Sequence, residues 1–111
     1  SIERIFDADA ATYMNTDKIN PLVIEVDYSK PALMKGMTIV LGSEEEHLTI
    51  ELTTPDGNFI FKEEFQASNG IKTVNLVFGK IYEVTNFRYI QQDPNAIPEA
   101  IMHLWEISLD Q

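Results

Sequence analysis

Apolar and polar residues alternate with a period of two along most of this chain, the pattern of β-strands with one buried and one exposed face. In the clearest case, residues 22–28, every second side chain is apolar. The predicted strands are 22–28, 37–42, 47–53, 59–65, 74–78, 82–91 and 100–109. Their inward residues are expected to form the core: Leu22, Ile24, Val26, Met37, Ile39, Leu41, Leu48, Ile50, Leu52, Phe59, Phe61, Phe65, Val74, Leu76 and Phe78.

Short turn signals separate these strands. Pro55-Asp56-Gly57 combines a proline of fixed φ with a permissive glycine, and Asn69-Gly70 holds two residues that accept positive φ, so both are predicted hairpin turns. Ser29-Lys30-Pro31 and Gly79-Lys80 are expected to end strands. The three consecutive glutamates at 44–46 are expected to form a solvated, self-repelling loop.

No segment has a convincing helical period, and the only candidate for a helical turn runs from Asp9 to Met14. About eight short strands separated by frequent turn signals are typical of an antiparallel β-sandwich or jelly roll. With 111 residues and 44% hydrophobic positions, the chain has enough material for one core and too little for two. We therefore predict an all-β, eight-stranded antiparallel jelly-roll sandwich, a single domain over residues 1–111 that belongs to a longer protein.

Charge and composition narrow the range of partners. The net charge of -10 argues against nucleic acid and anionic membranes, because phosphate binding needs clustered Lys and Arg. The absence of cysteine excludes disulfides, zinc-thiolate sites and thiol nucleophiles. No apolar run approaches 18 residues and no signal-peptide pattern is present, so membrane insertion is not expected.

The sequence offers no arrangement typical of a catalytic site. Nucleophilic catalysis needs a nucleophile beside a base, and the chain has neither cysteine nor a serine in a glycine-flanked elbow. His47 and His103 fall inside predicted strands without a paired-histidine metal motif, so both are interpreted as structural or surface residues. We expect a binding or structural module rather than an enzyme.

The stretch from Ile5 to Tyr13 concentrates oxygen-bearing side chains. Asp7, Asp9 and Thr12 could converge on a hard cation such as calcium, which prefers carboxylate and carbonyl oxygens. The same residues also suit a turn or a helix start with an aspartate capping free backbone amides, so both interpretations stay open. An EF-hand is excluded because Lys18 stands where the closing glutamate would be. Any calcium site must therefore take a further ligand from elsewhere.

Five segments, in order along nearly the whole chain, resemble motifs of a known family. They look like parts of the discoidin-like domains, also called coagulation factor 5/8 type C domains, which include carbohydrate-binding module family 32. The first resembles the family's opening phenylalanine-aspartate-glycine-aspartate segment, and the last two resemble its arginine-tyrosine strand and its closing leucine-glutamate-isoleucine strand. The segments are Phe6–Met14, Pro21–Tyr28, Met34–Ile39, Phe87–Ile90 and Leu104–Leu109.

The resemblance implies an eight-stranded, galactose-binding-like jelly roll that serves as a non-catalytic module of a secreted bacterial glycoside hydrolase or an adhesive protein. Such a protein would be extracellular, periplasmic or on the cell surface. Many members hold a structural calcium ion with the opening loop and a glutamate of the last strand. In this chain the corresponding residues are Asp7, Asp9, Thr12 and Glu106. The chain departs from the family at Ala8, where a glycine is usual, and at Met14, where a tryptophan is usual.

Sugar binding needs an aromatic face for the C–H surface of the ring and a few convergent polar groups, typically on loops. The candidate aromatic platforms near the predicted strand ends are Tyr13, Tyr28 and Tyr82. The candidate polar partners are Asn15, Asp17, Asn58, Asn69, Gln92 and Asn95. Trp105 is expected in the core from the alternation of its strand, and Arg88 is expected to be a structural ion-pair or packing residue.

The function expected first is a carbohydrate-binding accessory module whose partners are a glycan and the catalytic domain of the same polypeptide. The alternative is a structural or protein-interaction β-sandwich without a sugar site, and the scarcity of aromatic residues in the loops favours it. In either case the isolated domain is expected to be monomeric.

Overall fold

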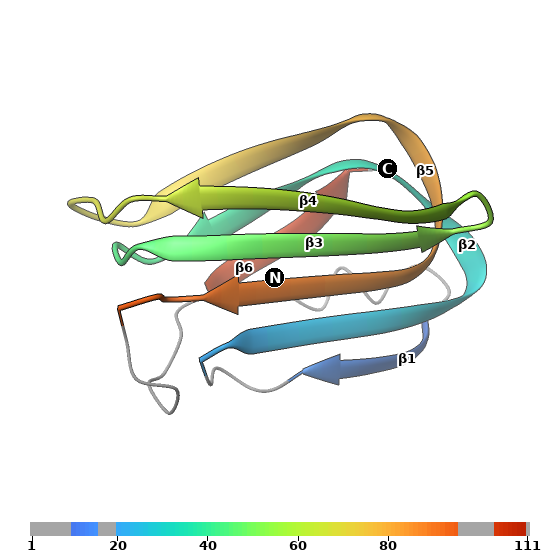
Figure 1. Cartoon of the computed structure of the whole chain (residues 1–111), viewed down its shortest axis with the longest axis horizontal. Coiled ribbons are helices and arrows are strands. Elements are labelled where there is room, and N and C mark those ends of the chain that lie inside the picture. Colours follow the sequence, from blue (N-terminus) through green and yellow to red (C-terminus); the bar gives the residue numbers. More distant parts are fainter. Residues whose placement is uncertain (1–9, 16–19, 96–103, 111) are drawn as a thin grey trace.

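The computed structural model describes residues 10–15, 20–95 and 104–110, with the first and last of these ranges defined by their backbone. They contain six strands: β1 (Ala10–Asn15), β2 (Leu22–Leu41), β3 (Glu46–Thr54), β4 (Gly57–Phe65), β5 (Lys72–Gln92) and β6 (Leu104–Asp110) (Figure 1). All strand pairs among the described residues are antiparallel, as predicted. No helix occurs in these ranges, and thus none that could cross a membrane.

Two long strands organise the sheet. β2 has 20 residues and β5 has 21, and they pair with each other along almost their whole length. The remaining strands attach to this pair, giving the order β1-β2-β5-β3-β4, with β6 pairing the far half of β2. The sequence predicted strand ends at 29–31 and 79–80, but both strands continue through those positions. This continuity merges four of the predicted strands into two, and β1 is a strand that the alternation did not predict.

Two bulges on opposite strands bend the long pair. Residues 28–31 of β2 lie opposite Thr85 alone, and residues 78–81 of β5 lie opposite Lys35 alone. The first bulge contains Pro31, which has no N–H to donate to a ladder, and the second contains Gly79 at a φ of 93°. The turn residues therefore bend the strands without ending them.

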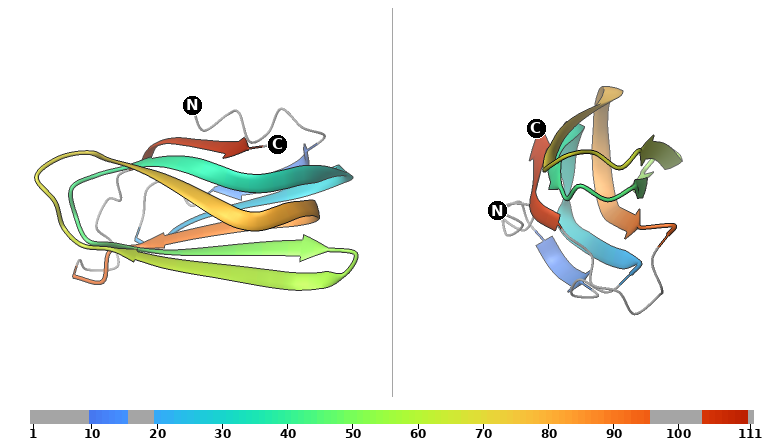
Figure 2. Two further views of the ribbon diagram at one scale, coloured as in Figure 1. Left: turned by 90° about the horizontal axis from the view of Figure 1, so that it is seen from above. Right: turned by 90° about the vertical axis from the view of Figure 1, so that its left-hand side faces the viewer.

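The bend folds the sheet back over itself into a β-sandwich-like arrangement (Figure 2). The first half of β2 and the last half of β5 lie with β1, β3 and β4, whereas the other halves of the two long strands pair with each other and, through β2, with β6. The core lies between the two layers and includes every fully buried large side chain among the described residues. These are Tyr89, Phe87, Leu22, Ile24, Met34, Met37, Ile39, Leu41, Leu48, Ile50 and Leu52.

The core predicted from alternation is confirmed for the long strands and for β3, whose inward residues are buried. Phe59, Phe61 and Phe65 of β4 and Leu76 of β5 are only partly buried against it. These residues lie where the two layers are open to solvent, because β4 is an edge strand that pairs with β3 alone.

The expected helical turn from Asp9 to Met14 is wrong for the described residues, because Ala10–Asn15 forms strand β1. This segment pairs with the first half of β2, with Thr12 opposite Asp27. The free edge of β2 provides backbone hydrogen bonds for this segment, and tertiary pairing overrides a weak local preference.

The two predicted hairpin turns have different outcomes. Pro55-Asp56 joins β3 to β4 as a two-residue hairpin loop, with Gly57 at a φ of 128°, as expected. Asn69-Gly70 is not a hairpin turn, because β4 and β5 do not pair within the described chain. The connection at 66–71 instead crosses from one layer to the other, and the Ser68 N–H donates to the Ser43 carbonyl at 2.8 Å.

Candidate functional site

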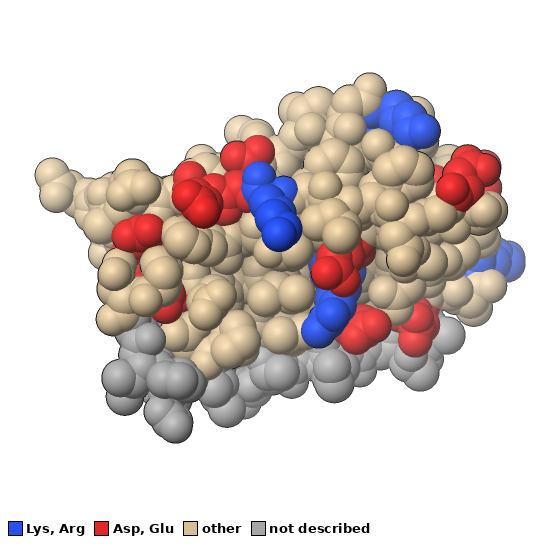
Figure 3. All heavy atoms as spheres, in the orientation of Figure 1, with Lys and Arg blue, Asp and Glu red and all other residues tan. Residues whose placement is uncertain are grey.

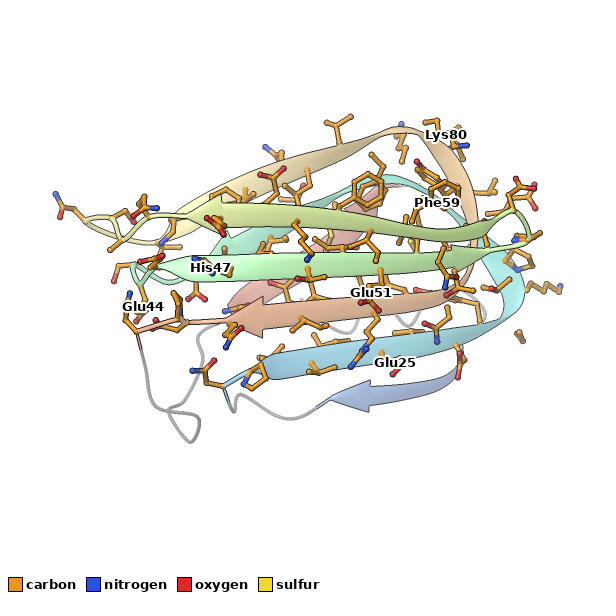
Figure 4. All side chains as sticks on the ribbon, in the orientation of Figure 1. Glu25, Glu44, His47, Glu51, Phe59 and Lys80 are labelled. Atoms are coloured by element: carbon orange, nitrogen blue, oxygen red, sulfur yellow. The ribbon has the colours of Figure 1, made fainter. Side chains whose placement is uncertain are left out.

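A pocket of about 250 Å³ opens where the β3–β4 turn meets the bend of β5. Phe59 and Lys80 mark this end of the molecule in Figure 4. The lining residues come from the turn, from β4 and from the bulged part of β5: Thr54, Pro55, Asp56, Phe59, Lys80, Ile81, Tyr82 and Glu83. We call it the bend pocket.

The turn side of the bend pocket is held by hydrogen bonds. The Thr54 hydroxyl donates to the Gly57 carbonyl at 3.1 Å and accepts from the Asp56 N–H, also at 3.1 Å. The positive φ of Gly57 lets the loop close in two residues. The exposed carboxylate of Asp56 is thereby carried on a closed turn at the edge of the pocket.

Aromatic rings form the inner wall of the bend pocket. The Phe59 and Tyr82 ring centroids lie 4.8 Å apart with the ring planes inclined at 53°. Behind them, the Phe61 and Phe78 rings stack at 4.8 Å. These contacts join β4 to β5 without backbone pairing, and aromatic pairs of this geometry stabilise by about 0.5–1.5 kcal/mol each. Tyr82 is 9% exposed, so Phe59 presents the more accessible ring.

Lys80 is the basic residue of this wall. Its Nζ lies 5.3 Å from the Phe59 ring centroid and 4.9 Å from that of Tyr82, within the range of a cation–π interaction. The bulge at 78–81 and the left-handed conformation of Gly79 turn the chain so that Lys80 reaches back over both rings. The pocket therefore combines an ammonium group, two rings and the carboxylates of Asp56 and Glu83.

A second, shallower hollow of about 410 Å³ lies on the other side of Lys80. It is lined by Lys35, Val77, Gly79, Lys80 and Ile81. Val77 is 82% exposed and Ile81 is 62% exposed, which is unusual for large aliphatic residues on one strand. The bend of β5 thus carries both a polar pocket and an apolar surface.

The opposite end of the sandwich carries the glutamates at 44–46, where Glu44 and His47 are labelled in Figure 4. The prediction of a solvated loop is wrong for Glu46, which is 1% exposed. Burial raises the pKa of Glu46 to about 7, a hydrogen bond from Gln91 opposes the shift, and Asp93 adds to it. One carboxylate oxygen of Glu46, Oε2, has no hydrogen-bond partner.

Glu45 and His47 form an outer layer over this end. His47 Nε2 lies 2.9 Å from Glu45 Oε2, and the Asn95 side-chain amide donates to Glu45 Oε1 at 3.0 Å. The hydrogen bonds from Asn95 and from His47 lower the pKa of Glu45. His47 is thus a structural residue, as predicted, while His103 lies outside the described residues.

Arg88 also has the structural role predicted for it. Its Nη1 lies 3.6 Å from Glu51 Oε2 on the neighbouring strand, and Asn86 nearby donates to Glu25 at 3.2 Å and to Asp27 at 2.6 Å. Figure 3 shows acidic groups distributed over this face with basic groups between them, and no basic patch. Glu25, Glu51, Asn86 and Arg88 are half-buried on this outer face of the sheet.

The structure describes only part of the predicted calcium site. Thr12 lies in β1 opposite Asp27, and Glu106 lies in β6 opposite Val40, whereas Asp7 and Asp9 lie outside the described residues. Among the residues that the structure does describe, no group of three or more acidic or histidine side chains is placed to hold a metal ion.

The predicted sugar-contacting residues do not form one site. Tyr28 is 7% exposed and burial raises its pKa well above the ordinary value, so its ring is a core element and not a platform. Asn69 is exposed in the crossing loop, and Asn95 is bonded to Glu45. The side chains of Tyr13 and Asn15 lie outside the described part of the structure, as does that of Trp105.

Sequence reasoning missed the residues that do converge: Asp56, Lys80, Glu83 and, at the other end, Glu46. Alternation contained a signal for Glu46, because positions 46, 48, 50 and 52 share the inward face of β3. Of the bend pocket, the sequence reasoning named only Tyr82 as a site residue, one of the predicted aromatic platforms, because Phe59 and Lys80 come from strands that are not paired. Comparison with known proteins adds nothing, since no protein-family model, curated protein or solved structure matches the chain.

Proposed function

We propose that this chain is a non-catalytic carbohydrate-binding accessory module of a secreted polysaccharide-processing protein, and that it binds sugar in the bend pocket. The observation that carries the proposal is the partly exposed Phe59 ring, set among Thr54, Asp56 and Glu83. An aromatic face and a few convergent polar groups are what a sugar ring requires. The volume of about 250 Å³ suits a single sugar residue, such as a chain end or a branch.

We also propose that the chain has a jelly-roll topology and that it is related to the discoidin-like domains. If the two halves of β2 and of β5 are counted separately on either side of their bulges, the described strands number eight, as in the galactose-binding-like jelly roll. The antiparallel, two-layered arrangement also supports a relationship with discoidin-like domains. A jelly roll of this kind would present its ligand site on a preformed scaffold, remote from any catalytic centre of the parent protein.

A second candidate function is a protein-interaction domain without a sugar site. The observation that favours it is the exposure of Val77 and Ile81, which place an apolar surface beside Lys35 and Lys80. A neighbouring domain of the same polypeptide could cover that surface. This function predicts that replacing Val77, which does not line the bend pocket, with serine weakens domain association, whereas the sugar-binding function predicts no effect on glycan affinity.

Replacing Phe59 with alanine is expected to weaken glycan binding at least tenfold, because the pocket loses its accessible aromatic face. Phe65→Ala is the matched control, since Phe65 lies on the inward face of the same strand and does not line the pocket. Affinity electrophoresis against a panel of neutral, acidic and amino polysaccharides measures the effect, and thermal melts check that both variants fold. Failure of the native chain to bind any member of the panel would leave the protein-interaction function.

We also propose a structural calcium ion held by Asp7, Asp9, Thr12 and Glu106. The support is that β1 and β6, which carry Thr12 and Glu106, both pair with β2. Chelation is expected to lower the melting temperature, because an ion bound only by the folded state stabilises by about 2.7 kcal/mol at a hundred times its dissociation constant. Calorimetry with calcium and with chelator measures this, and Glu106→Gln should reduce the difference. Equal melting temperatures in the two conditions would contradict the site.

A further inference from the structure

We infer that the sugar bound in the bend pocket carries a protonated amine, as in a hexosamine unit, an inference that rests on the carbohydrate-binding function proposed above. A side chain of the protein already places an ammonium group against the two rings of the pocket. The ammonium of Lys80 lies 5.3 Å from the Phe59 ring centroid and 4.9 Å from the Tyr82 ring centroid. One cation is thus shared by two ring faces, and a ligand ammonium can make the same contacts.

The wall geometry favours a cation over a neutral group. The Phe59 and Tyr82 rings are inclined at 53° with centroids 4.8 Å apart, so they form a wedge and not a flat platform. A flat platform suits the C–H face of a neutral sugar, whereas a wedge of two π-faces directs negative potential at one point. The Lys80 ammonium is within cation–π range of both rings, and Figure 4 shows its side chain beside Phe59.

The charges around the bend pocket favour the same ligand. Asp56 and Glu83 line it, so an arriving ammonium meets two carboxylates and an arriving uronate is repelled by them. The whole chain carries a net charge of -10, which adds a long-range attraction for cations. The lining is net negative even with Lys80 in place, because one positive group faces two negative groups, and displacement of Lys80 makes it more negative.

Lys80 is suited to be displaced. It is exposed, and a lysine side chain is a point charge on a flexible four-carbon stem. It also borders the apolar hollow with Val77 and Ile81, which can receive the stem when the ammonium leaves the rings. Lys80 therefore competes with an amino sugar for the same ring faces, and its removal is expected to tighten binding of amine ligands more than binding of neutral sugars.

The experiment compares a glucosamine dimer with its fully N-acetylated counterpart, which has the same backbone and no charge, by isothermal titration calorimetry below pH 7. The native chain is expected to bind the amine form at least tenfold more tightly. Lys80→Met should raise the ratio of amine-dimer affinity to acetylated-dimer affinity about threefold to tenfold. Glu83→Gln should lower the same ratio, because it removes a carboxylate that faces the ammonium group.

Lys62→Met is the matched control for overall charge. Lys62 lies on β4, does not line the bend pocket and is exposed, so its removal makes the chain more acidic by the same amount without touching the rings. If Lys62→Met tightens the amine dimer as much as Lys80→Met does, the effect is a general attraction of charge and the inference is overturned.

The remaining outcomes separate this inference from the proposed function. Equal binding of the two dimers would overturn the amine preference and keep a carbohydrate module. Absence of binding to these dimers and to the whole polysaccharide panel would overturn both. Binding of a lysine-containing peptide in place of the amine dimer would show that the pocket receives a protein side chain, and would equally overturn the inference.

Discussion

Replacing Glu46 with glutamine is expected to stabilise the folded chain by up to about 3 kcal/mol at pH 7.5. Glu46 is 1% exposed, and burial raises its pKa from 4.5 to about 7. At that pH the native protein must keep this carboxylate charged in the interior, whereas the unfolded chain ionises it in water. Glutamine has nearly the same shape and removes that cost.

The sign of the pH dependence follows from the direction of the shift. Between pH 4.5 and 7 the unfolded chain releases the Glu46 proton while the folded chain still holds it. The free energy of unfolding therefore falls as the pH rises through this window and levels off above about 7. Gln91 and Lys72 oppose the shift, while Asp93 and Glu44 reinforce it, so all four groups around Glu46 contribute to the profile.

Urea unfolding at pH values from 4 to 8 measures this contribution as the difference between the native chain and Glu46→Gln. That difference should be small below pH 4.5 and grow up to about pH 7. The control is Glu63→Gln on β4, because Glu63 is exposed and its substitution removes the same charge. A constant difference across the whole range would mean that Glu46 ionises normally in the folded protein.

Phe87→Ala is expected to lower the free energy of unfolding by about 3–5 kcal/mol, from the loss of buried area and the cavity left behind. Phe87 is fully buried at the middle of the sheet, in register with Val26 on one side and Leu52 on the other. Because domains of this size are stable by only about 5–15 kcal/mol, this one substitution removes a large fraction of the total.

Chemical denaturation of Phe87→Ala, with Ile60→Ala as the matched control, measures the loss. Ile60 is 58% exposed on the outer face of the edge strand β4, so its truncation should cost about 0.5 kcal/mol or less. Where Phe87→Ala proves too unstable to purify, Phe87→Leu keeps the comparison, with a smaller loss in the same direction. Similar losses for positions 87 and 60 would mean that the layers do not pack around β5 as described.

The bend of the two long strands connects the fold with the proposed function. The bulge at 78–81 interrupts the ladder opposite Lys35 and lifts Lys80 toward the rings of β4 and β5. A regular ladder would place residues 78–81 against partners on β2 and leave no hollow at this end. The same irregularity that lets the sheet fold over itself therefore creates the bend pocket.

The all-β class, the inward faces of the long strands and the hairpin at Pro55-Asp56 are all predictable from the sequence. These features are local: burial of one face of a strand has a period of two, and a proline followed by a glycine defines a turn without distant partners. Alternation therefore identified Leu22, Ile24 and Val26 correctly before any fold was known.

Features that depend on distant neighbours are not predictable from the local pattern and emerge only in the folded chain. Ala10–Asn15 is a strand because β2 offers an edge, and Asn69-Gly70 crosses between layers because β4 finds no partner in β5. The raised pKa of Glu46 depends on its burial and on neighbours far along the chain, with Asp93 adding to the shift and Gln91 opposing it. The bend pocket exists because unpaired strands bring Phe59, Tyr82 and Lys80 together. The local pattern shows which side of a strand faces inward, but it does not show which distant residues pack against that side.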